Sequence, residues 1–255
     1  MKKDLVLTND GSYTLYSEQF DQNYHSQKEG ALNESLSKHI IPAISYHKDK
    51  KELNILDICF GLGYNTLATI YYIEQNNLDI KLNIYSPEFD GDLIISLKDF
   101  NYPKEFEKYK DIITQLSTKL KYNSNNINIE IYQGDARKYL DILAPSNIDI
   151  VYQDAFSSDV NKALWTKEYF GQIKKLLKED AIITTYSIAT PIRLSIWENN
   201  ISIYEYKPEN SNRITIAINN TKIIKKENYK YIDMVLKQKR NTEARSLSDT
   251  TINSN

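Results

Sequence analysis

Two short runs with many apolar residues open the chain. Leu5–Thr8 and Tyr13–Tyr16 flank the turn sequence NDG at 9–11, which predicts two short strands joined by a tight turn. After a polar stretch, apolar positions at helical spacing predict a helix over about Leu32–Tyr46. We therefore expect residues 1–50 to form an N-terminal extension of short strands and one helix.

From residue 51 the pattern changes to apolar strands that alternate with amphipathic helices. Short apolar runs predict strands at Asn54–Cys59, Leu82–Ser86, Ile127–Gln133, Ile148–Gln153 and Ala181–Tyr186. Helical periodicity predicts helices at about Asn65–Asn76 and Trp165–Lys178. This alternation is typical of an α/β fold with a mainly parallel sheet and helices on both faces.

The last part of the chain has a different pattern. Ile201–Tyr206 and Arg213–Ile218 are joined by the turn-prone KPENSN, which predicts an antiparallel hairpin. We expect one α/β domain over residues 51–220, followed by a basic C-terminal segment, 221–255. The polar end of that segment, from about Asn241, is expected to be disordered.

Composition narrows the class of protein. The 255 residues are 41% hydrophobic and 26% charged, which is ordinary for a soluble globular protein. No apolar run approaches the ~20 residues that span a bilayer, and the N-terminus lacks the apolar core of a signal peptide, so we expect a cytoplasmic protein without a membrane partner. Because Cys59 is the only cysteine, a disulfide framework and a cysteine-based zinc site are excluded.

Charge argues against general affinity for nucleic acid. The chain has 32 basic and 34 acidic side chains, so any RNA contact would need a local basic patch. His25, His39 and His47 lack the i, i+4 spacing of a helical metal site and have no obvious carboxylate partner, so no metal is expected. Neither a GxSxG nucleophile elbow nor a Walker A motif is present.

The first candidate ligand-binding residues follow the first predicted strand. Open α/β sheets bind ligands at the carboxyl ends of their strands. Here Asp57 and Phe60 stand beside Gly61 and Gly63. Glycines at this place let the backbone approach a ligand and open a helix whose N–H groups point at it. A plain tight turn would explain the same residues.

Three further strand ends carry acids. Glu88, past the second strand, can accept hydrogen bonds from both hydroxyls of a ribose, or is a solvated acid. Gly134 and Asp135 follow the third strand, where a short acceptor can bind an adenine amino group, although Asp135 can equally cap the next helix. Asp154 ends the fourth strand, where a carboxylate can handle a nucleophile.

Together these segments resemble one family. The run YHSQKEGALNES at 24–35, then LDICFGLGYNTL, SPE, QGDA and YQDAFSSDVNKALWTKEYF, is similar to the methyltransferase domain of the bacterial tRNA 5-methylaminomethyl-2-thiouridine biosynthesis family, MnmC. The resemblance covers about residues 5–220. Its most distinctive pattern is DxFxxxxNxxxWtxxxF, which here reads Asp154, Phe156, Asn161, Trp165 and Phe170.

The resemblance implies a fold, a cofactor and a substrate. It implies the class I, Rossmann-like methyltransferase fold, S-adenosyl-L-methionine as methyl donor, and the aminomethyl group of a wobble uridine in the tRNA anticodon loop as acceptor. The chain resembles the stand-alone members of the family, which lack the flavin oxidase domain. The resemblance therefore implies no flavin. The residues that it places around the cofactor are Tyr24, Glu34, Gly61, Gly63, Glu88, Asp135 and Asp154. Asp154 would also face the acceptor amine as the catalytic residue.

The chain departs from the family pattern at two places. The usual glycine turn GFGTGLN reads CFGLGYN here, and the usual Lys-Arg near the last strand reads Asn212-Arg213. Phe156 is a candidate for stacking on the base, and Arg193 and Arg213 for contact with a phosphate or the cofactor carboxylate. The C-terminal basic residues could also contact phosphates, or form a solvated face. They are Lys222, Lys225, Lys226, Lys230, Lys237, Lys239, Arg240 and Arg245.

Two other functions remain open. An aminopropyltransferase of the spermidine synthase type uses a similar sheet, a glycine-rich first turn and an acid after the fourth strand. The YHS…GALNES and NxxxW segments fit the tRNA family better. A methyltransferase fold kept as a non-catalytic binding protein is the second alternative, and the four intact ligand-facing segments argue against it.

Overall fold

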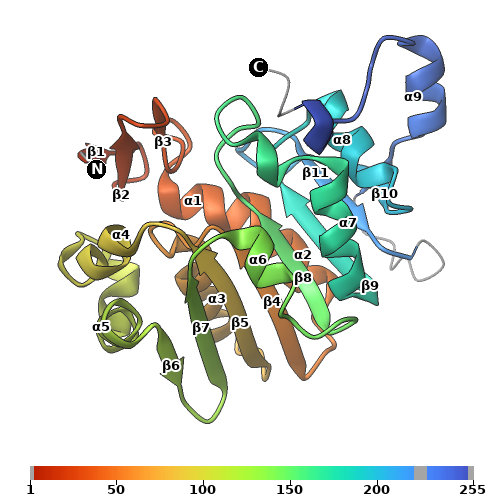
Figure 1. Cartoon of the computed structure of the whole chain (residues 1–255). Coiled ribbons are helices and arrows are strands. Elements are labelled where there is room, and N and C mark those ends of the chain that lie inside the picture. Colours follow the sequence, from red (N-terminus) through yellow and green to blue (C-terminus); the bar gives the residue numbers. More distant parts are fainter. Residues whose placement is uncertain (1–2, 221–228, 252–255) are drawn as a thin grey trace.

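The computed structural model describes residues 3–220 and 229–251 (Figure 1). Its main element is a nine-stranded sheet in the order β12-β10-β11-β9-β8-β4-β5-β7-β6. The parallel core consists of β4 (Glu52–Ile58), β5 (Lys81–Glu88), β7 (Ile127–Gln133), β8 (Ile148–Gln153) and β9 (Leu177–Thr185). The antiparallel strands are β6 (Lys121–Asn123), β10 (Ser202–Tyr206), β11 (Ile214–Ile218) and β12 (Lys230–Tyr231).

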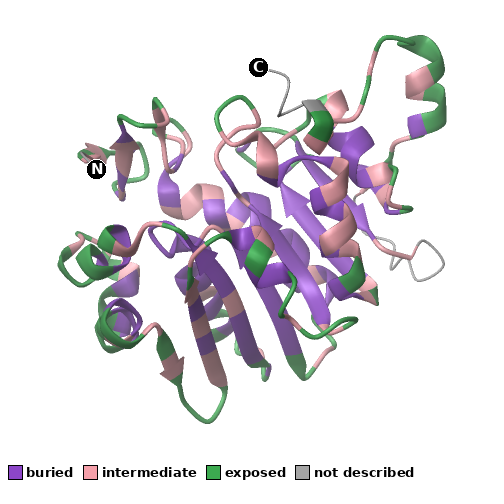
Figure 2. Cartoon of the chain, in the orientation of Figure 1, coloured by how far each residue is buried: buried purple, intermediate pink, exposed green. Residues whose placement is uncertain are grey.

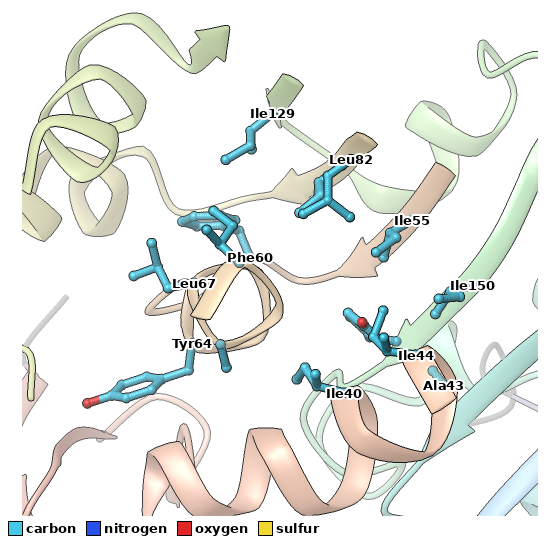
Figure 3. Close-up of a cluster of buried hydrophobic side chains, with 14 of the residues drawn as sticks. Ile40, Ala43, Ile44, Ile55, Phe60, Tyr64, Leu67, Leu82, Ile129 and Ile150 are labelled. Carbon is cyan, nitrogen blue, oxygen red and sulfur yellow. The ribbon is translucent and has the colours of Figure 1, made fainter. Parts of the chain in front are cut away.

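Successive residues of the central strands bury their side chains on opposite faces of the sheet. Ile55 packs on the same face as Leu82, Ile129 and Ile150, against α3 (Tyr64–Gln75) and the helix at 31–46 (Figure 3). Leu56, the next residue, joins the cluster on the other face. The helices there are α6 (Ala136–Leu140), α7 (Lys167–Leu176) and α8 (Thr190–Trp197). The predicted parallel sheet with helices on both faces is confirmed.

The predicted helix at 32–46 forms, with an irregular middle. It comprises α1 (Ala31–Ser35), a π-helical stretch η1 (Leu36–Ile40) and α2 (Ile41–Tyr46). Pro42 lacks the N–H that a regular α-helix would donate one turn back, which suits the wider π turn before it. Lys38 and His39 are buried in this turn, and it therefore carries two charged or titratable side chains into the molecule.

The N-terminal extension forms a small antiparallel sheet. Its strands are β1 (Lys3–Leu7), β2 (Tyr13–Ser17) and β3 (Gln22–Asn23), with Leu5 opposite Leu15. Figure 1 draws this sheet apart from the large one and next to α1. The two predicted strands and their turn are therefore present, and the third strand was not predicted.

The predicted C-terminal hairpin is β10 and β11, paired antiparallel. β11 lies between β9 and β10, so the hairpin extends the parallel core with antiparallel strands. The sequence reading missed α8 before this hairpin, and also β6, β12 and α9 (Met234–Arg240). The remaining helices, α4 (Gly91–Ser96) and α5 (Lys110–Lys119), fall in the long polar stretch between β5 and β7. Figure 2 shows buried central strands, whereas β6 and α9 carry exposed residues.

The end of the chain differs from the expectation of disorder. Arg137 donates two hydrogen bonds to the Asp249 carboxylate, at 2.8 and 2.9 Å, and Thr166 donates a third at 2.7 Å. The Asp249 N–H donates to Glu168 at 2.9 Å. A bidentate guanidinium–carboxylate pair of this kind holds a polar segment that has few apolar side chains. The chain is thus anchored up to residue 251, while 252–255 and Lys222, Lys225 and Lys226 lie outside the described residues.

Candidate functional site

A cavity of about 540 Å³ opens where the parallel strands β4, β5, β7 and β8 end. This volume lies within the ~300–1,000 Å³ of small-molecule sites. The loops after the four strands form one side of it, and the N-terminal extension forms the other. The sequence-predicted residues that line it are Tyr24, Glu34, Phe60, Gly61, Glu88, Gly134, Asp135, Asp154 and Phe156.

The glycine turn after β4 uses backbone conformations that favour glycine. Gly61 has a φ of 54°, and a Cβ placed there would lie 3.3 Å from the Tyr24 ring. Gly63, with a φ of 73°, precedes α3, and its Cβ would meet the Phe60 ring at 2.8 Å. Gly61 faces the cavity, but Gly63 does not line it. In this structure Gly63 supports the turn beneath the cavity wall by giving room to the Phe60 ring.

Glu88 joins the glycine turn to the end of β5. Its carboxylate accepts hydrogen bonds from the N–H groups of Gly61 and Asp90, both at 2.8 Å. Burial raises the pKa of Glu88, and these N–H groups counter only part of that rise. The carboxylate is therefore held in one place at the cavity wall, where it can accept hydrogen bonds from the hydroxyl groups of a ligand.

Asp135 fulfils both roles considered for it. Its side chain caps α6 by accepting the Lys138 N–H at 3.0 Å, and it also lines the cavity together with Gly134. Glu34 lies on the opposite side of the cavity. It accepts the Ser26 N–H and the Lys38 ammonium, each at 2.6 Å, so it ties the helix at 31–46 to the N-terminal extension.

Asp154 is held on two sides. Asn65 donates to one carboxylate oxygen at 2.9 Å, and His39 Nε2 lies 3.4 Å from the other. Burial alone would raise the pKa of Asp154, but His39 and the Asn65 amide outweigh it and lower the pKa below its ordinary value. Asp154 is therefore an ionised acceptor at the cavity wall.

Asp57, predicted as a cofactor contact, is not among the residues that line the cavity. It is fully buried and accepts hydrogen bonds from Thr66 at 2.9 Å and from Asn65 at 3.3 Å. Burial raises its pKa to about 7 in spite of these bonds. Because both donors belong to the first turn of α3, Asp57 orders the glycine turn from beneath instead of contacting a ligand.

Arg193 and Arg213 do not reach the cavity, contrary to expectation. Arg193 is buried, donates to Thr215 at 2.9 Å and lies 3.5 Å from Glu205. Arg213 also pairs with Glu205, at 3.3 Å. Glu205 stands on β10, so the hairpin supplies one carboxylate that engages both cations away from the site. Although both arginines are close in sequence to the ends of strands, neither side chain lies in the cavity.

An aromatic wall closes the cavity on the N-terminal side. The Phe156 ring packs on Phe20, with centroids 4.6 Å apart, and on the edge of Tyr24 at 4.9 Å. Beside it, Gln22 donates to the Ser157 hydroxyl at 2.6 Å and accepts the Ser157 N–H at 3.2 Å. The N-terminal extension is thus fastened to the loop after β8. Trp165, which belongs to the same family pattern as Phe156, is buried and donates to the Phe156 carbonyl at 2.7 Å.

Sequence reasoning missed two residues of the site. His39 was judged to have no carboxylate partner, yet it lies against Asp154. The available signal was a histidine directly before the apolar run IIPAI. Asn65 was not singled out, although it follows the glycine turn directly and bridges Asp57 and Asp154.

The lining fits a cationic adenosine cofactor. Glu34, Glu88, Asp135 and Asp154 surround the cavity with carboxylates, and Gly61 leaves space for a close approach of the backbone. A sulfonium cation would be attracted by these acids. Across the described residues, no cluster of His, Cys, Asp and Glu side chains is arranged to hold a metal ion. Within the same ranges, no helix is both long and apolar enough to cross a membrane.

Comparisons with known proteins place the chain in a class. The family described as S-adenosyl-L-methionine-dependent methyltransferase matches residues 102–219. The crystal structure of MNMC2 from Aquifex aeolicus superposes with a TM-score of 0.83 and 26% identity, covering 100% of this chain and 81% of that one. A probable spermidine synthase from Corynebacterium glutamicum superposes with a TM-score of 0.59 at 13% identity, over 97% of this chain and 92% of that one, which shows a shared fold alone.

Two relatives found by sequence match this chain over only part of their own length. An uncharacterized protein of Methanocaldococcus jannaschii is 31% identical over 85% of this chain and 59% of that protein. The tRNA 5-methylaminomethyl-2-thiouridine biosynthesis bifunctional protein MnmC of Campylobacter fetus is 23% identical over 76% of this chain and 32% of that protein. This chain therefore spans a little over half of the first relative and about a third of the second.

The fold and the cavity define a class I, Rossmann-like methyltransferase that depends on S-adenosyl-L-methionine. Within that class, the chain is similar along its whole length to MNMC2 from Aquifex aeolicus.

Proposed function

We propose that this chain methylates the aminomethyl group of a wobble uridine in tRNA, converting 5-aminomethyl-(2-thio)uridine into 5-methylaminomethyl-(2-thio)uridine. The observation that carries the proposal is the carboxylate of Asp154, which Asn65 holds by a hydrogen bond and His39 approaches to 3.4 Å, at the wall of a cavity lined by several acids. The likeness to MNMC2 along the whole chain supports it.

The cofactor supplies a methyl group already activated by its sulfonium. Glu88 would accept hydrogen bonds from the ribose hydroxyls, and Asp135 from the adenine amino group. Gly61 would leave room for the cofactor beside the glycine turn. The acids that line the cavity would attract the positively charged sulfonium of the cofactor before methyl transfer. This attraction would be lost once the methyl group has left and the sulfur is neutral.

Asp154 would orient the acceptor. An amine attacks only through a free lone pair, so it must be neutral when it meets the methyl group. Asp154 would accept a hydrogen bond from the amine and hold the lone pair in line. Since the methyl group is already activated, positioning supplies most of the rate enhancement.

The aromatic wall would receive the base. RNA-binding proteins stack splayed bases of single-stranded loops on aromatic rings. Phe156, supported by Phe20 and Tyr24, offers such a ring at the rim of the cavity. Basic residues of α9 and the segment after it would contact phosphates, so binding should weaken with added salt.

Methyl transfer from labelled S-adenosyl-L-methionine to tRNA from a strain lacking this gene tests the proposal. Nucleoside mass spectrometry of the digested tRNA should find label on 5-aminomethyluridine. The Asp154→Ala variant should lose turnover by about 100-fold or more, while cofactor binding by calorimetry largely survives. Normal turnover in this variant, or unlabelled tRNA with the wild type, would contradict the proposal. A polyamine product from decarboxylated cofactor and a diamine would favour the aminopropyltransferase alternative instead.

A further inference from the structure

His39 is a buried histidine whose one side faces the proposed catalytic residue. It has no exposed surface, and its Nδ1 lies 2.8 Å from the Thr184 hydroxyl on β9. Its ring packs edge-on against Tyr152 of β8, at 5.8 Å between centroids. These contacts hold the imidazole so that Nε2 lies 3.4 Å from an Asp154 oxygen.

Nε2 of His39 has no hydrogen-bond partner within normal distance, although it is buried. Buried polar atoms are nearly always paired, and exceptions mark places where a group has a further task. The other oxygen of Asp154 is engaged by Asn65. Asp154 thus stands between a fixed imidazole and the cavity, with the oxygen nearest His39 receiving no other hydrogen bond that the structure records.

The proposed reaction needs a place for a proton. A primary alkylamine is mostly protonated near neutral pH, as a lysine side chain is, and must lose this proton before it can attack. Asp154 lines the cavity and one of its oxygens lies 3.4 Å from Nε2 of His39, so a proton received from the amine can pass on to the imidazole. An imidazole is the side chain suited to accept a proton in this pH range.

We propose that His39 takes up the proton of the acceptor amine through Asp154. This inference rests on the proposed function. The ammonium gives its proton to Asp154, which passes it to Nε2 of His39. The freed lone pair forms the N–C bond while the C–S bond breaks, and the methylated amine carries the positive charge that leaves the sulfur. When the products leave, the proton returns through Asp154 to solvent. His39 acts through Asp154 and is a positioning residue.

Three charged or titratable side chains interact electrostatically with His39. They are Asp154, Asp57 and, on the N-terminal extension, His25. Thr184 and Tyr152, which pack directly on the ring, are neutral groups. Its chain neighbour Lys38 is already paired with Glu29 and Glu34.

The pH dependence of His39→Gln tests the inference. With an anticodon stem-loop that carries 5-aminomethyluridine, kcat of this variant should fall about 100-fold at pH 7. The deficit should shrink steadily toward pH 9, because more of the acceptor then arrives already neutral. Thr184→Val, which removes only the bond to Nδ1, should show a smaller deficit with the same trend. Cofactor affinity should stay within about threefold in both variants, since neither residue lines the cavity.

His47→Gln is the matched control. His47 is also buried, but its Nε2 lies 3.2 Å from the Asp149 carbonyl near the start of β8, whereas Asp154 follows the end of that strand. This variant should keep the wild-type pH profile. A deficit of constant size from pH 6.5 to 9 in folded His39→Gln would overturn the inference and leave the proposed function intact. Should that variant fail to fold, Thr184→Val decides by the same criterion. If the wild type itself does not methylate the stem-loop, the proposed function fails and this inference fails with it.

Discussion

The side-chain amide of Asn65 donates a hydrogen bond to Asp154 at 2.9 Å. The same amide nitrogen lies 3.3 Å from Asp57, which is buried beneath the glycine turn. One amide therefore connects the acid that orders the end of β4 with the acid at the end of β8. Because β4 and β8 are neighbours in the sheet, this connection sets the position of Asp154 relative to the turn that would receive the cofactor.

The buried carboxyl of Asp57 should make stability depend on pH. Its pKa of about 7 in the folded protein lies above the ordinary value of 3.8, so between these values the folded state binds more protons than the unfolded one. Stability from this group is thus fully present below about pH 4 and is lost as pH rises toward 7. Between pH 5 and 7 the loss is at most about 3 kcal/mol.

Urea unfolding of the wild type and Asp57→Asn at pH 5, 6, 7 and 8 measures this contribution. The free energy of unfolding of the variant should fall less steeply than that of the wild type up to pH 7, and the two slopes should agree above it. Parallel slopes across the whole range would show that Asp57 is ionised in the folded protein.

Gly61→Ala should weaken cofactor binding by tenfold or more. The added Cβ lies 3.3 Å from the Tyr24 ring, on the side that lines the cavity, and the φ of 54° strains a residue with a side chain. Gly11→Ala is the control, because Gly11 has a φ of 83° but open space around it. Both variants should lose about 1 kcal/mol of stability, and only Gly61→Ala should lose affinity in calorimetry. Equal affinities would remove the glycine turn from the cofactor site.

Phe156→Ala should weaken RNA binding while Phe156→Tyr retains it. Stacking of a base on an aromatic ring contributes about 1–3 kcal/mol, which corresponds to a 5- to 150-fold change in Kd. Fluorescence anisotropy with a labelled anticodon stem-loop measures the change. Unaltered Kd in Phe156→Ala would place the base elsewhere in the cavity.

Asp249→Ala should release the C-terminal segment from Arg137 and Thr166. A partly exposed ion pair contributes little to stability, so the free energy of unfolding should fall by only about 1 kcal/mol. Residues beyond 241 should nevertheless become sensitive to limited proteolysis. Asp141→Ala is the control, because Asp141 accepts a hydrogen bond from the half-buried Gln172 side chain and leaves the Arg137–Asp249 pair in place. Equal proteolysis rates in the two variants would show that the Arg137 pair does not hold the segment.

Much of the parallel core could be predicted from the sequence because each strand has an apolar pattern within its own residues. Runs such as Ile148–Gln153 are mostly apolar and are buried at every position, as expected of strands covered on both faces. Once the strands are known, the residues that follow them must meet at one edge of the sheet. The positions of Gly61, Glu88 and Asp154 in one cavity follow from that local pattern.

Only the tertiary structure decided which other polar residues join them. Arg193 and Arg213 lie near the same region of the chain, yet Glu205 on a neighbouring strand engages both. His39 is distant in sequence from Asp154, but the helix at 31–46 packs across the sheet and brings the two together. The polar end of the chain reads as disordered until Arg137 holds Asp249. Hydrophobic periodicity is a property of neighbouring residues, whereas these pairings join segments far apart in the chain, so local sequence carries no record of them.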